Sequence, residues 1–156
     1  FCVGEQIEAH PQTLARIARE GHLIGNHTYS HCNMMLCGRA ESKRQLTKTQ
    51  QLIAEISGQT PQFWRAPFGF RAPWTQNVAA RLGLRSALWS INPRDFQNPG
   101  VDVLVARVME TLQSGVIVLL HDGFQDRQQT VQALRKLIPL IREKGYKFVR
   151  LDEATE

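Results

Sequence analysis

Residues 21–31, Gly-His-Leu-Ile-Gly-Asn-His-Thr-Tyr-Ser-His, place two histidines directly after a short stretch that is typical of a β-strand. His27 and His31 are four residues apart, and on a helical turn this spacing puts two imidazoles on one face, where they can bind one metal ion. Two imidazoles suit zinc and its first-row neighbours, and a catalytic zinc ion normally has a third protein ligand, for which a carboxylate is expected. The alternative is two unrelated loop histidines, but their place at the end of a strand favours metal binding.

Strand-like and helix-like segments alternate along the whole chain around this stretch. The strand-like segments are residues 1–4, 22–25, 63–65, 85–91, 116–120 and 146–151, and the helix-like segments begin near Pro11, Ala40, Pro73, Val101 and Val131. Such alternation predicts an α/β fold with a parallel sheet, either open or closed as a barrel. A closed barrel of the common kind has about eight strands. Because the chain enters in mid-strand and offers fewer strands than this, we expect a sheet that is incomplete on its N-terminal side.

Four polar segments come directly after predicted strands, at residues 27–31, 65–69, 92–96 and 121–122. In α/β sheets the functional groups gather at the carboxyl ends of the parallel strands. We therefore expect the four segments to converge on one rim if the sheet curls. This placement indicates a catalytic site.

The same segments resemble the motifs of the NodB-homology polysaccharide deacetylases, also called carbohydrate esterase family 4. Residues 21–31 are similar to the second motif of that family, residues 65–69 to the third, residues 89–96 to the fourth and residues 119–122 to the fifth. The resemblance implies a distorted (β/α) barrel of the NodB-homology type, with residues 1–156 as a single, N-terminally truncated domain. It also implies metal-dependent removal of acetyl groups from an N-acetylated polysaccharide or oligosaccharide, such as a chitin-, peptidoglycan- or capsule-like glycan.

Catalytic roles follow from the resemblance, position by position. His27 and His31 would bind a divalent metal, which we expect to be zinc, and His121 would be the general acid that protonates the leaving amine. Asp95 would orient and tune His121. The backbone amide of Phe68 would help to hold the oxyanion. Considered without the resemblance, His121 could also belong to a polar turn, and Asp95 could be a loop residue with a local salt bridge.

Further residues complete the expected site. Arg65 would pair with a catalytic aspartate, although it could equally be an ordinary surface arginine. Leu119 and Phe96 would line the small pocket for the acetyl methyl group, and we add Trp89 to that pocket. Phe96 stands where the family usually has Trp, and Leu119 would be a core residue in any fold.

The first motif of the family, an Asp-Asp pair that provides the base and the third metal ligand, has no counterpart in the sequence. We expect a fragment of a longer enzyme, in preference to a naturally inactive variant or to a chain that takes a carboxylate from another chain. Residues 1–156 alone are then expected to have little or no deacetylase activity. The alternative functions are an inactive carbohydrate- or metal-binding member of the same fold and an O-esterase of the acetyl-xylan type.

Composition narrows the class of protein. The 156 residues suffice for one domain. Hydrophobic residues make up 42% and charged residues 21% of the chain, which is ordinary for a globular protein. The net charge of +5 comes from scattered basic residues, so we expect no nucleic-acid partner. The longest apolar run, residues 116–120, is too short to span a membrane. The resemblance implies an extracytoplasmic or cell-envelope location, although no signal peptide is visible, and the sequence predicts no oligomeric state.

The three cysteines are Cys2, Cys32 and Cys37, so at most one pair can form within one chain. Cys32 and Cys37 are close enough in sequence for a local bridge in an oxidising compartment. Their spacing is not that of a good zinc pair. Structural or free thiols are the default interpretation.

Overall fold

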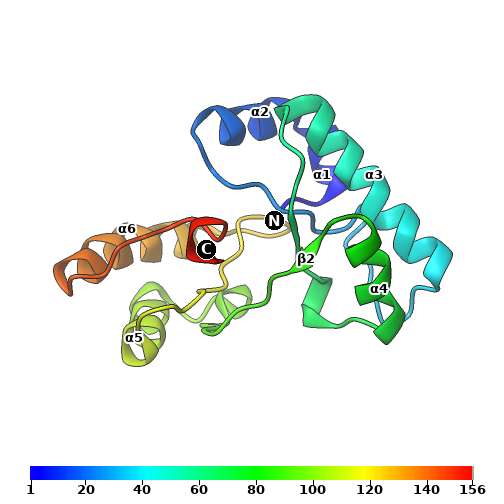
Figure 1. The fold of residues 1–156 in the computed structure, drawn as a ribbon. Helices are drawn as coiled ribbons and strands as arrows, with labels where there is room; N and C mark the ends of the chain where they lie inside the picture. Colours follow the sequence, from blue (N-terminus) through cyan, green and yellow to red (C-terminus); the bar gives the residue numbers. More distant parts are fainter. Residues whose placement is uncertain (156) are drawn as a thin grey trace. The chain divides into compact units, whose positions relative to one another are not determined.

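The computed structural model describes residues 1–155. The chain divides into two compact units, Phe1–Leu88 and Trp89–Glu156, which are described separately below. The assignment of residues 1–156 to a single domain stays a prediction. Figure 1 shows the elements in chain order, with α1 to α4, β1 and β2 in the first unit and α5 and α6 in the second. None of the helices in the described part of the chain combines the length and the apolar character that a membrane span requires.

The first unit contains four helices. They are α1 (Gly4–Ala9), α2 (Pro11–Arg19), α3 (Arg39–Ser57) and α4 (Pro73–Arg81). Pro11 and Pro73 stand at the first position of α2 and α4, where the missing N–H of proline leaves no helical hydrogen bond unmade. Gly58 ends α3 in the left-handed conformation, with a φ of 69°. The predicted helices near these starts are confirmed, and α1 is an addition to them.

Extended segments of the first unit pair in parallel and in chain order. The strands β1 (Phe63–Trp64) and β2 (Arg85–Ser86) form the regular part, and Asn26 bridges Cys2 on one side to Trp64 on the other. The Asn26 N–H donates to the Phe63 carbonyl over 2.9 Å, and the Asn26 carbonyl accepts from the Arg65 N–H over 2.9 Å. The parallel arrangement is as predicted, but the paired stretches are shorter than predicted, because each segment bends into a loop or helix after one or two rungs.

Helix α3 connects two apolar clusters of the first unit. Leu46 lies in a cluster with Met34, Trp64 and Leu84, whereas Ile53 lies in a cluster with Ile7, Leu14 and Ile24. Leu46 and Ile53 are both fully buried, and their spacing of seven residues puts them two turns apart on one face of the helix. The long helix therefore holds both ends of this unit, and the loop that precedes it is fixed at its C-terminal end.

The second unit is built on α5 (Val101–Thr111) and α6 (Gln128–Glu143). The two helices pack around Leu104, Val108, Ala133 and Leu137, and beside them Ile91 pairs in parallel with Val118. Residues 85–91 and 116–120 were predicted as longer strands and show only this bridge beyond β2. The predicted strand over residues 146–151 is wrong, since these residues form no strand in the structure and Phe148 and Val149 are exposed.

Candidate active site

The imidazole of His27 is oriented by the backbone that follows β1. Its Nδ1 lies 2.7 Å from the Arg65 carbonyl oxygen. Because a carbonyl oxygen can only accept, Nδ1 carries the proton and donates it, and Nε2 retains a lone pair. Burial lowers the pKa of His27 to about 3, which keeps the ring neutral at neutral pH. A neutral imidazole whose second nitrogen is hydrogen-bonded to a carbonyl is the arrangement that histidine metal ligands generally show.

His31 reaches His27 through a strained loop and not through a helical turn. The two ring centroids are 4.9 Å apart, with ring planes at 77°. Residues 27–31 form no helix, and Thr28 and His31 have positive φ values of 65° and 54°. The prediction that helical spacing brings the two rings together is therefore wrong in its local geometry. Positive φ is costly for residues with a Cβ, so the loop depends on its surroundings to hold this conformation.

Neighbouring elements hold this loop by its backbone. The first N–H groups of α1, from Gly4 and Glu5, donate to the carbonyls of Thr28 and Tyr29 over 3.0 and 2.9 Å. A Cβ at Gly4 would collide with the Tyr29 ring, so only glycine allows this close approach.

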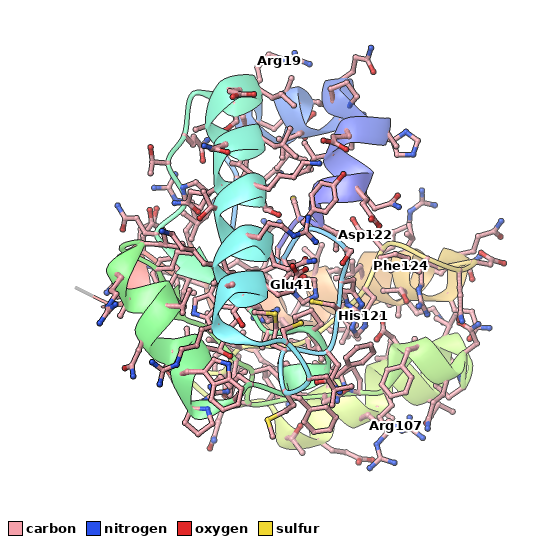
Figure 2. The ribbon with its side chains drawn as sticks, turned by 90° about the vertical axis from the view of Figure 1, so that its right-hand side faces the viewer. Arg19, Glu41, Arg107, His121, Asp122 and Phe124 are labelled. Carbon is pink, nitrogen blue, oxygen red and sulfur yellow. The ribbon has the colours of Figure 1, made fainter. Side chains whose placement is uncertain are left out.

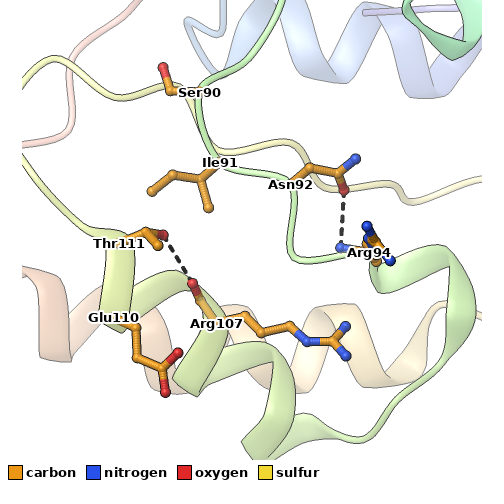
Figure 3. Close-up of a pocket in the computed structure, with 7 residues that line it drawn as sticks. All are labelled: Ser90, Ile91, Asn92, Arg94, Arg107, Glu110 and Thr111. Carbon is orange, nitrogen blue, oxygen red and sulfur yellow. Dashed lines mark hydrogen bonds between the residues drawn. The ribbon is translucent and has the colours of Figure 1, made fainter.

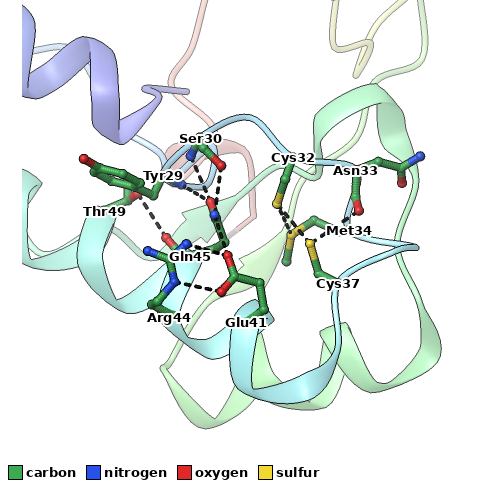
Figure 4. Close-up of polar contacts among 10 residues, drawn as sticks. All are labelled: Tyr29, Ser30, Cys32, Asn33, Met34, Cys37, Glu41, Arg44, Gln45 and Thr49. Atoms are coloured by element: carbon green, nitrogen blue, oxygen red, sulfur yellow. Dashed lines mark hydrogen bonds and ion pairs between the residues drawn. The ribbon is translucent and has the colours of Figure 1, made fainter.

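Gln45 of α3 supports the other side of the loop, as Figure 4 shows. Its side-chain oxygen accepts hydrogen bonds from the backbone N–H groups of Tyr29 and Ser30, over 2.8 and 2.9 Å. Its amide nitrogen donates to the Ser30 hydroxyl and to Glu41, each over 2.9 Å. Gln45 is only 1% exposed. Sequence reasoning missed this residue, although buried polar residues at positions 42, 45 and 49 form a stripe at helical spacing.

Arg65 and Phe68 lie beside the two histidines. The Arg65 guanidinium donates to the carbonyls of Ala87 and Leu88, each over 2.9 Å, and lies 4.0 Å from the centre of the Phe1 ring. Burial lowers the pKa of Arg65 to about 10, so it remains charged at neutral pH. Its predicted pairing with a catalytic aspartate stays a prediction.

Phe68 occupies a tight turn, η1 (Pro67–Gly69), with a positive φ of 58°. Its ring meets the His31 ring edge-on, with centroids 4.9 Å apart. None of the backbone hydrogen bonds between turns and loops of residues 1–155 has the Phe68 N–H as its donor. The oxyanion role predicted for this amide stays a prediction.

The second unit contains a buried carboxylate–imidazole pair. Oδ1 of Asp95 lies 2.7 Å from Nδ1 of His121, and Oδ2 accepts the His121 backbone N–H over 2.7 Å and the Thr130 hydroxyl over 3.1 Å. Asp95 is fully buried, whereas the His121 side chain is 34% exposed in the loop before α6 (Figure 2). Sequence reasoning missed Thr130, because a threonine near a helix start is usually explained as a cap.

The charge on Asp95 is stabilised by these contacts. Burial raises the pKa of Asp95, but the hydrogen bonds and charge of His121, together with the Thr130 hydrogen bond, outweigh it, and the pKa lies below its ordinary value. The carboxylate therefore fixes His121 with its proton on Nδ1, which leaves Nε2 as the nitrogen that can exchange a proton. This is the geometry of a general acid–base histidine.

The residues predicted to line the acetyl pocket make fewer contacts with the two histidine sites. The rings of Phe96 and His121 are 6.1 Å apart at 87°, Leu119 is buried at 7% exposure, and Trp89 is half-buried. A separate pocket of about 380 Å³ lies where the 90–94 segment faces α5 and includes Arg94 and Arg107 (Figure 3). It contains none of the predicted site residues. The roles of Phe96, Leu119 and Trp89 in binding the acetyl group stay predictions.

The two histidines supply only part of the donor set that a metal ion needs. No three His, Cys, Asp or Glu side chains gather into a metal-binding cluster among the described residues. His27 and His31 fit two of the ligands of a zinc ion by their donor type and by the orientation of His27. The metal-binding role of His27 and His31 stays a prediction, and a third ligand does not lie beside them in residues 1–155.

Comparison with known proteins identifies the family. The family model of polysaccharide deacetylase matches residues 1–87, which is more than half of the chain and includes both histidines. The chain belongs to the polysaccharide deacetylase family. A chitooligosaccharide deacetylase of Bradyrhizobium sp. (strain ANU 289) is 35% identical over 163 residues, which cover 95% of this polysaccharide deacetylase chain and 73% of the relative.

Solved structures confirm the predicted NodB-homology fold class. A peptidoglycan N-acetylglucosamine deacetylase superposes with a TM-score of 0.95 at 33% identity, and the match covers 99% of this chain and 72% of the other. A CE4 family pseudoenzyme from Bacillus anthracis superposes with a TM-score of 0.92 at 27% identity over 99% of this chain. The chain spans 53% of the length of that pseudoenzyme. Members of one fold class therefore include both named deacetylases and a pseudoenzyme.

Proposed function

We propose that this polysaccharide deacetylase is a metal-dependent hydrolase that removes acetyl groups from N-acetylated glycans of the chitin or peptidoglycan kind. The observation that carries the proposal is the Asp95–His121 pair, at 2.7 Å. An amine is a poor leaving group until it is protonated, so cleavage of an acetamide needs a positioned acid. Family membership and the names of the relatives support the glycan class.

Each residue has a defined part in the proposal. His27 and His31 would hold the metal, for which zinc is the best match to two imidazole donors. When bound, zinc polarises the acetyl carbonyl and lowers the pKa of water to about 7. The Phe68 N–H donates to the carbonyl oxygen as negative charge develops on it. His121, held by Asp95, transfers a proton from Nε2 to the departing amine nitrogen.

The test is acetate release from an N-acetylated chito-oligosaccharide, measured together with zinc content on the full-length natural protein that carries residues 1–156. His121→Ala should lower kcat about 100-fold or more while the zinc content stays unchanged. His27→Ala should lose both zinc and activity. His22→Ala is the matched control, because His22 is exposed and lies only five residues before His27, and it should change neither. Acetate release that survives His121→Ala would overturn the proposal.

A catalytically inactive glycan- or metal-binding protein of the same fold is the second candidate. Two observations favour it: no third metal ligand stands beside the histidine pair in residues 1–155, and a CE4 pseudoenzyme is among the similar structures. It predicts that wild type binds zinc or the oligosaccharide and releases no acetate. An O-esterase would instead release acetate from acetylated xylan in preference to the acetamide.

A further inference from the structure

The loop between His31 and α3 brings two cysteines together. Sγ of Cys32 lies 3.1 Å from Sγ of Cys37, as Figure 4 shows. The sulfur–sulfur bond of a disulfide is about 2.05 Å long, so closure needs a movement of only about 1 Å. We propose that Cys32 and Cys37 form an intramolecular disulfide. This inference stands apart from the proposed function, because it concerns neither the metal nor the acid.

Hydrogen bonds order the backbone between the two cysteines and at Cys37. The side-chain oxygen and the carbonyl of Asn33 accept the N–H groups of Met35 and Leu36, each over 3.0 Å, which folds residues 33–36 into a turn. The Cys37 carbonyl accepts the indole N–H of Trp74 over 3.0 Å. The turn and the Cys37 backbone are therefore ordered before the bond forms, and little further conformational entropy is lost.

The surroundings favour a disulfide over two thiols. Cys37 is 9% exposed and belongs to the apolar cluster that includes Met34 and Trp64. The thiols have only weak partners, since Cys32 Sγ lies 3.7 Å from the Met34 sulfur and Cys37 Sγ lies 3.5 Å from the Asn33 carbonyl oxygen. Joining the sulfurs removes two weak donors from an apolar environment and breaks no strong hydrogen bond.

A metal ion held by the two sulfurs fits less well. Zinc–sulfur bonds are about 2.3 Å long, and tetrahedral coordination separates two thiolates by roughly 3.8 Å. The observed sulfur separation of 3.1 Å is shorter than this. The geometry therefore points to a direct bond between the sulfurs.

The reaction is an exchange with a small-molecule disulfide such as glutathione disulfide. Cys32 is partly exposed and Cys37 is buried, so Cys32 is the thiol that a small disulfide can reach. Burial raises the pKa of the Cys32 thiol to about 12, so the small fraction of Cys32 thiolate attacks the small disulfide slowly and releases one glutathione thiol. The Cys37 thiolate then attacks the Cys32 sulfur of the mixed disulfide and releases the second. Two protein thiols are oxidised, one glutathione disulfide is reduced to two thiols, and the two protons lost by the cysteines go to those thiols.

The bond would close a ring directly after His31. Its tip carries Met35 and Leu36, which are 49% and 84% exposed. Because His31 has a positive φ of 54°, a covalent restraint on the following residues opposes its relaxation. We expect the oxidised protein to unfold at a midpoint roughly 5 °C above that of the reduced protein.

The test is mass spectrometry of the purified protein after incubation with glutathione disulfide, denaturation and alkylation with N-ethylmaleimide. Wild type should carry one alkyl group, on Cys2, and its mass should be lower by two hydrogens before alkylation. Cys2→Ser should still close the bond and carry no alkyl group. Cys32→Ser should leave Cys37 alkylated, and its unfolding midpoint should no longer respond to reductant.

Two results would overturn the proposal. One is three alkylated cysteines in oxidised wild type. The other is a disulfide that contains Cys2 or joins two chains. Both results are measured on the wild-type protein, so the test of the disulfide does not depend on whether the serine variants fold.

Discussion

The histidine loop of the first unit and the Asp95–His121 pair of the second unit present imidazoles in opposite ways. The loop holds His27 and His31 by backbone hydrogen bonds from α1 and α3, and two of its residues have positive φ. The pair holds His121 by one buried carboxylate, which accepts three hydrogen bonds. The first arrangement depends on many weak supports and the second on a single charged group, so substitutions should affect them differently.

The largest effect is expected at the carboxylate. Asp95→Ala should lower the free energy of unfolding by about 3 kcal/mol, because it leaves the buried donors of His121 and Thr130 without an acceptor. Urea denaturation measures the change. Asp102→Ala is the matched control, since Asp102 pairs with Lys136 at 2.7 Å but its side chain is 88% exposed. The control should stay within about 0.5 kcal/mol of wild type. If Asp95→Ala and Asp102→Ala lost the same free energy of unfolding, the buried pair would contribute no more to stability than a surface ion pair.

The sequence predicted this pair well. A polar His after a continuous apolar strand, and a carboxylate after the preceding strand, must approach each other when those strands pair in parallel, as Ile91 and Val118 do. The contact of Asp95 with Thr130 on α6 was not predictable in the same way. Thr130 contacts Asp95 only because α5 and α6 pack closely, and tertiary packing of this kind has no local signal in the sequence.

A smaller effect is expected at the histidine loop. Gln45→Ala should lower the free energy of unfolding by about 2 kcal/mol, because the N–H groups of Tyr29 and Ser30 lose their acceptor. Zinc affinity should fall roughly 10-fold as the loop relaxes, which a competition titration with a chelating dye measures. Gln51→Ala changes an exposed residue of the same helix and should alter neither quantity. An unchanged zinc affinity in Gln45→Ala would mean that the backbone contacts of α1 suffice to hold the loop.

The loop also shows where sequence reasoning fails. The close approach of the His27 and His31 rings was predictable. The spacing of four residues does not determine φ, however, and the helical turn inferred from it is a strained loop. The predicted strands were too long for a related reason. Apolar runs indicate burial, whereas the length of a strand depends on how long its neighbours stay in register, and here the segments after Asn26 and Trp64 turn away at once.

Measured over a single pH unit, the smallest effect separates the two regions by pH in the metal-free protein. The pKa of His27 is lowered to about 3. Below the unfolded histidine value of about 6.5, therefore, only the unfolded state binds this proton. Stability should fall by about 1 kcal/mol for each pH unit as the pH drops below that value, and His27→Asn should remove this slope.

The carboxylate responds in a different pH window. Asp95 has a lowered pKa, so its contribution is complete above the ordinary aspartate value of about 3.9 and is lost only as the pH falls through the folded value. Asp95→Asn should leave the slope near pH 6 intact, and urea midpoints of the three proteins between pH 7 and about pH 2 measure both windows. A wild-type urea midpoint that does not change from pH 7 to pH 5 would show that His27 gains its proton in the folded state. The His27 imidazole would then be charged in the folded protein, and the contrast between the histidine loop and the Asp95–His121 pair would be lost.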